Sequence, residues 1–211
     1  MKRQLALFPL QIVVFPGESL NLHIFEPRYR ELLQDCEATG MTFGIPAYID
    51  GAIQEVGTEV KLVEVVKRYP NGELDIRTRG EGLFRLFDYQ PRMPGKLYAG
   101  GEIEELPFDP VEDPALNERI RELTQALFTE LRISKSLPER IADFRTYDVA
   151  HHVGFKLEQE YEFLTLFDAA GRQQFLIEHL ETLLPIVREM ERVKEKAKLN
   201  GHFRNIIPPE V

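Results

Sequence analysis

The sequence predicts an α+β protein in which a curled, barrel-like β-sheet is followed by a helical bundle. Three observations lead to this prediction. Polar and apolar residues alternate over much of the N-terminal half, and Asn71-Gly72 lies between two such stretches as a hairpin signal. After Leu106, prolines give way to apolar residues at helical spacing. We therefore expect two parts, residues 1–106 and residues 107–211.

The expected strands of the first part are short stretches of alternating or β-branched apolar residues. They are Leu5–Phe8, Ile12–Phe15, Ser19–Phe25, Phe43–Ile49, Val60–Val66, Leu74–Arg79, Gly82–Tyr89 and Leu97–Leu106. Because Asn-Gly tolerates the positive φ of a tight hairpin, the strands beside Asn71-Gly72 should pair. One short helix interrupts the series, which favours a curled sheet over parallel βαβ units.

That short helix should begin at Glu26-Pro27, because proline occupies the first helical position without losing a hydrogen bond. Apolar residues then follow at the spacing of one helical face, namely Tyr29, Leu32, Leu33 and Cys36. Gly40 should end the helix.

The second part is expected to contain several helices. The signals are an apolar stripe at Ile120, Leu123, Leu127 and Leu131, helix starts at Leu137-Pro138 and Thr146, a helix from Glu158 to Phe167, and a long last helix capped by Asp168. Pro185 should kink the last helix, and Asn200-Gly201 should end it before a tail at Ile206–Pro209.

Composition indicates a soluble globular protein, with 43% hydrophobic and 29% charged residues. Cys36 is the single cysteine, so no intrachain disulfide forms and secretion gains no support. The apolar stretch Leu5–Phe8 is too short for a signal peptide, and no apolar run approaches membrane-spanning length. A cytoplasmic location is therefore expected. The net charge of −9 counts against nucleic-acid binding.

Two stretches resemble a known family. Leu5–Gly17 contains L-x-L-F-P-L followed by F-P-G, and Leu22–Arg30 contains L-x-I-F-E-x-R-Y. In residue types and spacing they resemble the opening of the N-terminal, substrate-binding domain of Lon proteases. The hairpin at Asn71-Gly72 and Arg79-Gly80 agree as well. The resemblance covers Leu5 to about Leu106 well and the helical remainder loosely, and Asn21 stands where the family often has proline.

The resemblance implies a PUA-like β domain followed by a helical bundle. In full-length Lon proteases this region helps to recognise unfolded or tagged substrates and supports assembly, and stand-alone bacterial copies exist. It thus implies a non-catalytic module that binds protein or peptide, with an adaptor role beside a separate Lon-type protease in protein quality control. The implied partner is unfolded or extended polypeptide.

The resemblance also implies site residues. The peptide-binding candidates are His23, Phe25, Glu26, Arg28, Tyr29 and Arg79, and the structural residues of the family motif are Phe8, Pro9, Phe15, Pro16, Gly17 and Gly80. For some of these residues, their type and position in the sequence favour a structural role. Glu26 and Arg28 flank a strand-to-helix junction, where a structural role is the stronger interpretation: the helix dipole favours the Glu26 carboxylate, and Arg28 could pair with a carboxylate elsewhere in the barrel. Phe15, Phe25 and Tyr29 are favoured as core residues.

Motifs of catalysis are not found. Gly95-Lys96 lacks the upstream glycine of a phosphate-binding loop, and Ser134-Lys135-Ser136 does not resemble a Ser-Lys peptidase site. Gly80-Glu81-Gly82 is not followed by the third glycine of a dinucleotide fingerprint. His151 and His152 are adjacent, so on a helix they point about 100° apart and do not chelate one metal. We expect no enzyme activity, no cofactor and no metal.

Three alternatives stay open. PUA-like folds also occur in RNA-modifying proteins, so RNA binding is the first, through a basic face formed by Lys61, Lys67, Arg68, Arg77, Arg79 and Arg85. An enzyme of unknown type is the second, because catalytic groups converge in space rather than in sequence. The third concerns a homodimer through the last helix, weighed against packing within the same chain, with Leu180, Leu183, Val187 and Met190 at the contact.

Overall fold

The computed structural model describes the backbone of residues 1–202 and the side chains of residues 1–198. The chain forms two compact units. The β unit comprises Met1–Val111 and Ala150–Ala169, and the helical unit comprises Glu112–Val149 and the chain from Ala170 onward. These units differ from the two parts expected from the sequence chiefly because Ala150–Ala169 returns to the β unit.

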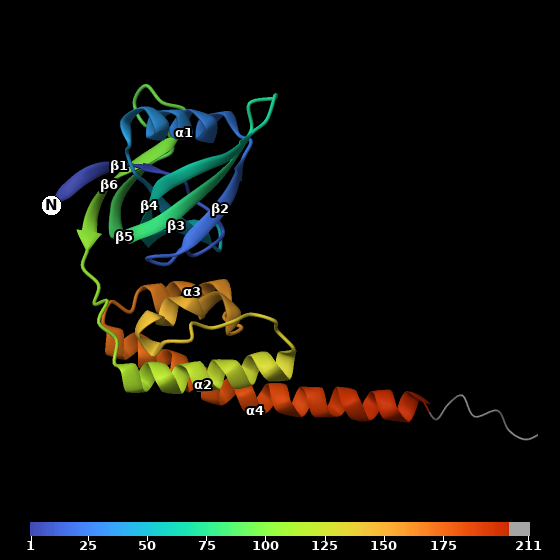
Figure 1. The fold of residues 1–211 in the computed structure, drawn as a ribbon. Coiled ribbons are helices and arrows are strands. Elements are labelled where there is room, and N and C mark those ends of the chain that lie inside the picture. The colour runs from blue at the N-terminus through green and yellow to red at the C-terminus, as the bar shows by residue number, and fades with distance from the viewer. Residues whose placement is uncertain (203–211) are drawn as a thin grey trace, which may run out of the picture. The chain divides into compact units, whose positions relative to one another are not determined.

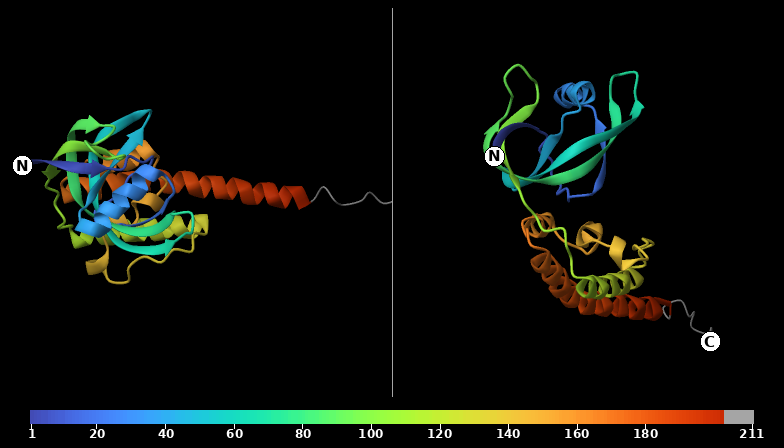
Figure 2. Two further views of the ribbon diagram at one scale, coloured as in Figure 1. Left: turned by 90° about the horizontal axis from the view of Figure 1, so that it is seen from above. Right: turned by 60° about the vertical axis from the view of Figure 1, so that its left-hand side comes forward.

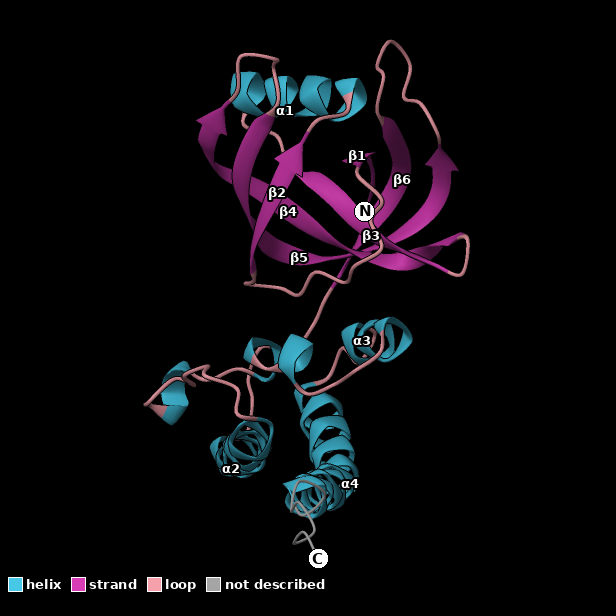
Figure 3. Ribbon diagram, turned by 90° about the vertical axis from the view of Figure 1, so that its right-hand side faces the viewer, coloured by secondary structure: helices cyan, strands magenta, loops and turns pink. Residues whose placement is uncertain are grey.

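Six strands form one mixed sheet in the β unit (Figures 1 and 3). They are β1 (Lys2–Leu7), β2 (Ser19–Ile24), β3 (Phe43–Ile49), β4 (Ala52–Arg68), β5 (Leu74–Gln90) and β6 (Ala99–Leu106). The strand order is β2-β5-β4-β3-β1-β6, and β6 also pairs with β5. The pairings therefore close a cycle through β5, β4, β3, β1 and β6, from which β2 branches. The α+β class is confirmed, while the barrel and its PUA-like type stay predictions.

Local turn signals account for most of the strand boundaries. Gly72 has φ 85°, so the predicted hairpin joins β4 to β5. Asp50 and Gly51 both have positive φ and end β3 where the sequence predicted. The two strands expected at Leu74–Arg79 and Gly82–Tyr89 are a single strand of 17 residues.

The strand predicted at Ile12–Phe15 is wrong. This stretch is an irregular segment between β1 and β2, although Val13, Val14 and Phe15 are almost fully buried. It lies between Pro9 and Pro16, and prolines cannot donate to a β ladder. The segment is held in part by a side chain instead, because the Thr58 hydroxyl donates to the Val14 carbonyl.

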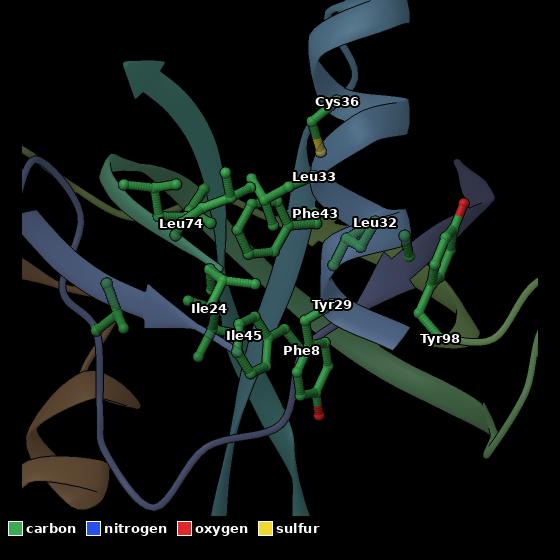
Figure 4. Packing of buried hydrophobic residues seen from close by; sticks show 14 residues of the cluster. Phe8, Ile24, Tyr29, Leu32, Leu33, Cys36, Phe43, Ile45, Leu74 and Tyr98 are labelled. Atoms are coloured by element: carbon green, nitrogen blue, oxygen red, sulfur yellow. The ribbon is translucent and has the colours of Figure 1, made fainter. Parts of the chain in front are cut away.

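Helix α1 (Pro27–Thr39) lies across one end of the curled sheet (Figures 1 and 3). The predicted apolar face is buried, and Gly40, with φ 72°, ends the helix by donating to the Cys36 carbonyl at 2.9 Å. Figure 4 shows this face meeting side chains of the sheet, together with Phe8, which follows β1, and Tyr98, which precedes β6. The rings of Tyr29 and Phe8 stack with centroids 3.6 Å apart. Helix α1 therefore completes the main apolar core.

The helical unit contains α2 (Pro114–Leu131) and most of α4 (Ala169–His202), whereas α3 (Leu157–Leu164) belongs to the β unit. Asp113 caps α2 by accepting from the Ala115 amide at 2.7 Å. Figure 2 shows α4 as one long helix that bends along its length. Pro185 lies inside it.

Several helix predictions are corrected. Leu137-Pro138 starts no helix, and Thr146 begins only a short 3-10 turn, Thr146–Asp148. The Thr146 amide and hydroxyl donate to Glu112, at 3.1 and 2.5 Å, so Thr146 is tied to this carboxylate instead of capping a longer helix. Helix α4 includes Asn200-Gly201 instead of ending there, and the expected tail at Ile206–Pro209 lies outside the described residues.

Candidate polypeptide-binding edge

Strand β2 is an edge strand of the sheet. It pairs with β5 alone, from Ser19 opposite Arg79 to Ile24 opposite Leu74. Within residues 1–202, its other edge takes part in no backbone hydrogen bond. Such an edge presents unpaired amide and carbonyl groups, to which an extended chain can pair.

The hydrogen-bond pattern shows which groups point outward. The Gly80 amide donates to the Glu18 carbonyl at 2.9 Å, just before β2 begins. In an antiparallel pair, residues that bond across the ladder alternate with residues that face away. Every second residue after Glu18 therefore faces β5, namely Leu20, Leu22 and Ile24. The amides and carbonyls of Ser19, Asn21 and His23 point to the open edge.

The two faces of β2 differ in polarity. Leu20 and Leu22 are half-buried and pack at the margin of the main core, whereas Ser19, Asn21 and His23 are exposed. The edge is therefore apolar on its inner side and polar on its outer side. A strand added here would meet leucine side chains on one face only.

An exposed aromatic cluster lies at the end of β2. Phe25 is 59% exposed, and its ring centroid lies 6.2 Å from that of His23. His23 Nδ1 lies 2.7 Å from Asp75 Oδ1, and the Tyr69 hydroxyl donates to the same carboxylate at 2.8 Å. The hydrogen bond to Asp75 raises the pKa of His23. The cluster thus holds His23 in place beside Phe25.

The next predicted residues form the junction with α1. Arg28 Nε donates to Glu26 Oε2 at 2.8 Å, so Arg28 pairs locally with Glu26 and not with a carboxylate elsewhere in the sheet. Tyr29 is 5% exposed and belongs to the core, as does Phe15. The core interpretation of Phe25 is wrong, because this side chain is exposed.

Arg79 does not join the cluster. It lies opposite Ser19, four residues along β5 from Asp75, which corresponds to about 13 Å at the usual rise of a strand. Its side chain is exposed and has no hydrogen bond or ion pair within the side chains described, residues 1–198. Arg79 therefore flanks the beginning of β2, while His23 and Phe25 flank its end.

The structural residues of the family motif fix where β2 begins. Gly17, with φ 83°, donates its amide to the Gly80 carbonyl at 2.9 Å. Gly80 lies so close to this loop that a Cβ there would be 2.3 Å from the Phe15 carbonyl oxygen. The Phe15 amide donates to Glu18 Oε2 at 2.8 Å. The turn after Pro16 is therefore locked against β5, and Phe8 stacks on the core helix as described above.

Sequence comparison identifies the family. Residues 4–182 match the family described as ATP-dependent protease La (LON) substrate-binding domain. The chain belongs to this family.

Two solved structures are similar to this member of the Lon substrate-binding family. One is the crystal structure of a Lon N-terminal domain protein from Xanthomonas campestris, with 27% identity and a TM-score of 0.61, over 87% of this chain and 98% of that chain. The other is the N-terminal domain of Mycobacterium avium complex Lon protease, with 15% identity and a TM-score of 0.63, over 85% of this chain and 98% of that chain. The second likeness shows the fold alone. The region matched is the non-catalytic substrate-binding part of Lon proteases.

Other features of this Lon-family chain concern metals, membranes and nucleic acid. The residues described contain no cluster of three or more His, Cys, Asp and Glu side chains suited to a metal, and no helix among them is long and apolar enough to cross a membrane. Two of the six basic residues considered for RNA pair with acidic residues. Arg77 pairs with Glu64 at 2.7 Å, and Arg68 pairs with Glu37.

The sequence analysis placed two further residues in a strand but did not predict that their side chains are exposed. Val63 and Val66 are each 55% exposed, and within the part of β4 that pairs with β5, Val56 to Arg68, they are the residues skipped by the register. Each is therefore the extra residue of a β-bulge, which turns its side chain to solvent. Nearby, a groove of about 320 Å³ separates β4 from the last turn of α1. The adjacent apolar pairs Leu62-Val63 and Val65-Val66, on either side of Glu64, break the two-residue alternation of a regular strand and could have indicated irregular pairing.

Proposed function

We propose that the chain binds extended segments of unfolded polypeptide, which add to the sheet along the open edge of β2. The observation that carries this proposal is the outward orientation of the amides and carbonyls of Ser19, Asn21 and His23, which have no partner in residues 1–202. Main-chain hydrogen bonds depend little on side-chain identity. This mode therefore suits a substrate-binding family, whose ligands are unfolded chains of varied sequence.

Side chains around the edge give the binding its preference for apolar segments. Half-buried Leu20 and Leu22 offer apolar contacts to alternate residues of the added strand. Phe25 offers a large exposed ring at the end of β2. Because these contacts are not ionic, the affinity should change little at moderate salt.

A proline substitution tests the edge directly. Asn21→Pro removes one outward donor without removing a hydrogen bond between β2 and β5, and proline is tolerated at outward positions of edge strands. Family members often have proline at this position, so the variant should fold. Asn21→Ala is the matched control, because it removes the same side chain and keeps the amide.

The measurement is fluorescence anisotropy of a labelled, permanently unfolded apolar peptide. The loss of one main-chain hydrogen bond of about 1 kcal/mol should weaken binding by Asn21→Pro about fivefold, and Asn21→Ala should bind as the unaltered chain does. The proposal would be abandoned if folded Asn21→Pro bound normally, or if the unaltered chain did not bind unfolded peptides.

An adaptor role beside a separate Lon-type protease extends this proposal. Delivery of substrate by the chain should accelerate degradation of a labelled unfolded protein by that protease, and Asn21→Pro should accelerate it less. If the rate of degradation is the same with and without the chain, the adaptor role is ruled out and the binding activity is unaffected.

A further inference from the structure

The second half of α4 carries an exposed apolar stripe, here called the α4 seam. Ile186, Met190 and Val193 are 53%, 54% and 54% exposed. Leu183, half-buried, precedes them, and the exposed Ala197 follows. The spacing alternates between three and four residues along α4, which is the pattern of the a and d positions in a coiled coil.

The seam is distinct from the face that α4 uses inside the helical unit. The inward residues Leu180, Leu184 and Val187 are 1%, 6% and 7% exposed. At 100° per residue, the centre of the seam lies about 110° around the helix from this inward face. Packing within the helical unit thus explains the inward residues and leaves the seam without a partner there.

We propose that the α4 seam binds the α4 seam of a second copy of this chain, forming a short two-helix coiled coil. Large apolar side chains at consecutive a and d positions are costly to leave in water, and they pack as knobs into holes against a like helix. A two-fold symmetric pair would use the same patch on both copies.

The charges beside the seam fit a second copy. Glu189 precedes Met190 and occupies a g position, whereas Lys194 occupies the next e position. In a parallel in-register pair, Glu189 of each copy faces Lys194 of the other. In an antiparallel pair it faces Lys196, at the other g position. Either orientation places opposite charges together, and within one helix Glu189 pairs with Arg192, an exposed partner three residues away.

This surface differs from the dimer contact expected from the sequence. Leu180 and Val187 were expected at the contact, but both are buried within their own chain. Leu183 and Met190 remain part of the seam. Because the seam spans only about two heptads, the dimer should be reversible and should dissociate on dilution.

The experiment is sedimentation velocity on the full chain, from low micromolar to submillimolar concentration. The unaltered chain should shift from monomer to dimer over this range. Val193→Lys places a charge at a d position and should raise the dissociation constant of the dimer about tenfold or more. Val66→Lys is the matched control, since this valine is equally exposed at 55% but lies on β4.

Exchanging the charges of the facing residues tests whether the partner is another copy of the chain. Glu189→Lys should weaken the dimer, and combination with Lys194→Glu or with Lys196→Glu should restore it, in the parallel or antiparallel pair respectively. Circular dichroism checks that each variant is folded. The proposal is overturned by a chain that stays monomeric at every concentration, by equal dissociation constants for folded Val193→Lys and Val66→Lys, or by the failure of both double variants to restore the dimer.

Discussion

His151 Nε2 lies 3.1 Å from a carboxylate oxygen of Glu18, which joins the returning segment Ala150–Ala169 to the loop before β2. The other ring nitrogen, Nδ1, lies 2.8 Å from Glu160, and the ring centroid lies 4.9 Å from that of Phe15. Burial alone would lower the pKa of His151, but the hydrogen bonds to Glu160 and Glu18 outweigh it and raise the pKa to about 9. The imidazolium is therefore the form held between the two carboxylates at neutral pH.

The free energy of unfolding should depend on pH through His151. Its pKa rises from 6.5 to about 9 on folding, so its contribution is complete below pH 6.5 and is lost as the pH rises to about 9. His151→Gln should therefore destabilise the chain by about 1–2 kcal/mol more at low pH than at high pH, allowing for screening by solvent. Urea unfolding of both proteins, below pH 6.5 and above pH 9, measures this difference. A deficit that is the same at both pH values would contradict the prediction.

Substitution of two neighbouring glycines should have unequal effects. A Cβ at Gly80 would lie 2.3 Å from the Phe15 carbonyl oxygen, whereas nothing lies within 4 Å of a Cβ at Gly82. Gly80→Ala should lower the free energy of unfolding by about 2–3 kcal/mol through overpacking against the backbone. Gly82→Ala should change it by less than about 0.5 kcal/mol. Thermal and urea unfolding compare the two, and equal stabilities would show that the loop at Phe15 moves freely away from β5.

Two exposed phenylalanines provide a test of where unfolded polypeptide binds. Phe25 is 59% exposed at the end of β2, and Phe87 is 47% exposed on β5, where Lys2 Nζ lies 4.0 Å from its ring centroid. Phe25→Ala should weaken peptide binding about fivefold, the usual effect of losing an aromatic contact worth about 1 kcal/mol, and Phe87→Ala should not. The anisotropy assay described above measures both. Equal affinities for the two variants would remove Phe25 from the site.

A buried carboxylate should be important for the stability of the helical unit. The side chain of Glu112 is 3% exposed, accepts from Asn117 at 2.9 Å and from the Thr146 hydroxyl at 2.5 Å, and lies 4.0 Å from the guanidinium of Arg172. Glu112→Ala should cost about 3–5 kcal/mol, because it leaves a buried cation without this carboxylate. Glu130→Ala, which removes a surface pair with Arg188, should cost less than about 1 kcal/mol. Calorimetry measures the melting temperatures of the two variants, and similar values would argue against this role of Glu112.

Local signals allowed several elements to be predicted from the sequence. The limits of β3, the hairpin at Asn71-Gly72 and helix α1 each follow from one turn residue or one apolar periodicity. The free edge of β2 was not predictable from local signals. The edge is open because β6 pairs with β1 and β5 and not with β2, and these pairings join residues far apart in the sequence.

In the candidate site, too, local patterns predict some features, whereas others depend on contacts between distant residues. The alternation along β2 places Ile24 inward, at 1% exposed, so Phe25 had to lie outward, and a stricter use of that pattern would have found it. Tyr69 and Asp75 support His23 because the hairpin brings them to β2. No spacing in the sequence indicates that contact.

The return of Ala150–Ala169 to the β unit makes that unit discontinuous in the chain. Phe163, in α3, meets the ring of Phe15 with centroids 5.8 Å apart, so a fragment that stops at Leu106 would leave this aromatic contact unmade. One proteolytic cut cannot release an intact β unit, because the polypeptide leaves it at Val111 and enters it again at Ala150. Deletion of residues 112–149 with a new linker between Val111 and Ala150, together with truncation after Ala169, would be the rational design for isolating the polypeptide-binding edge.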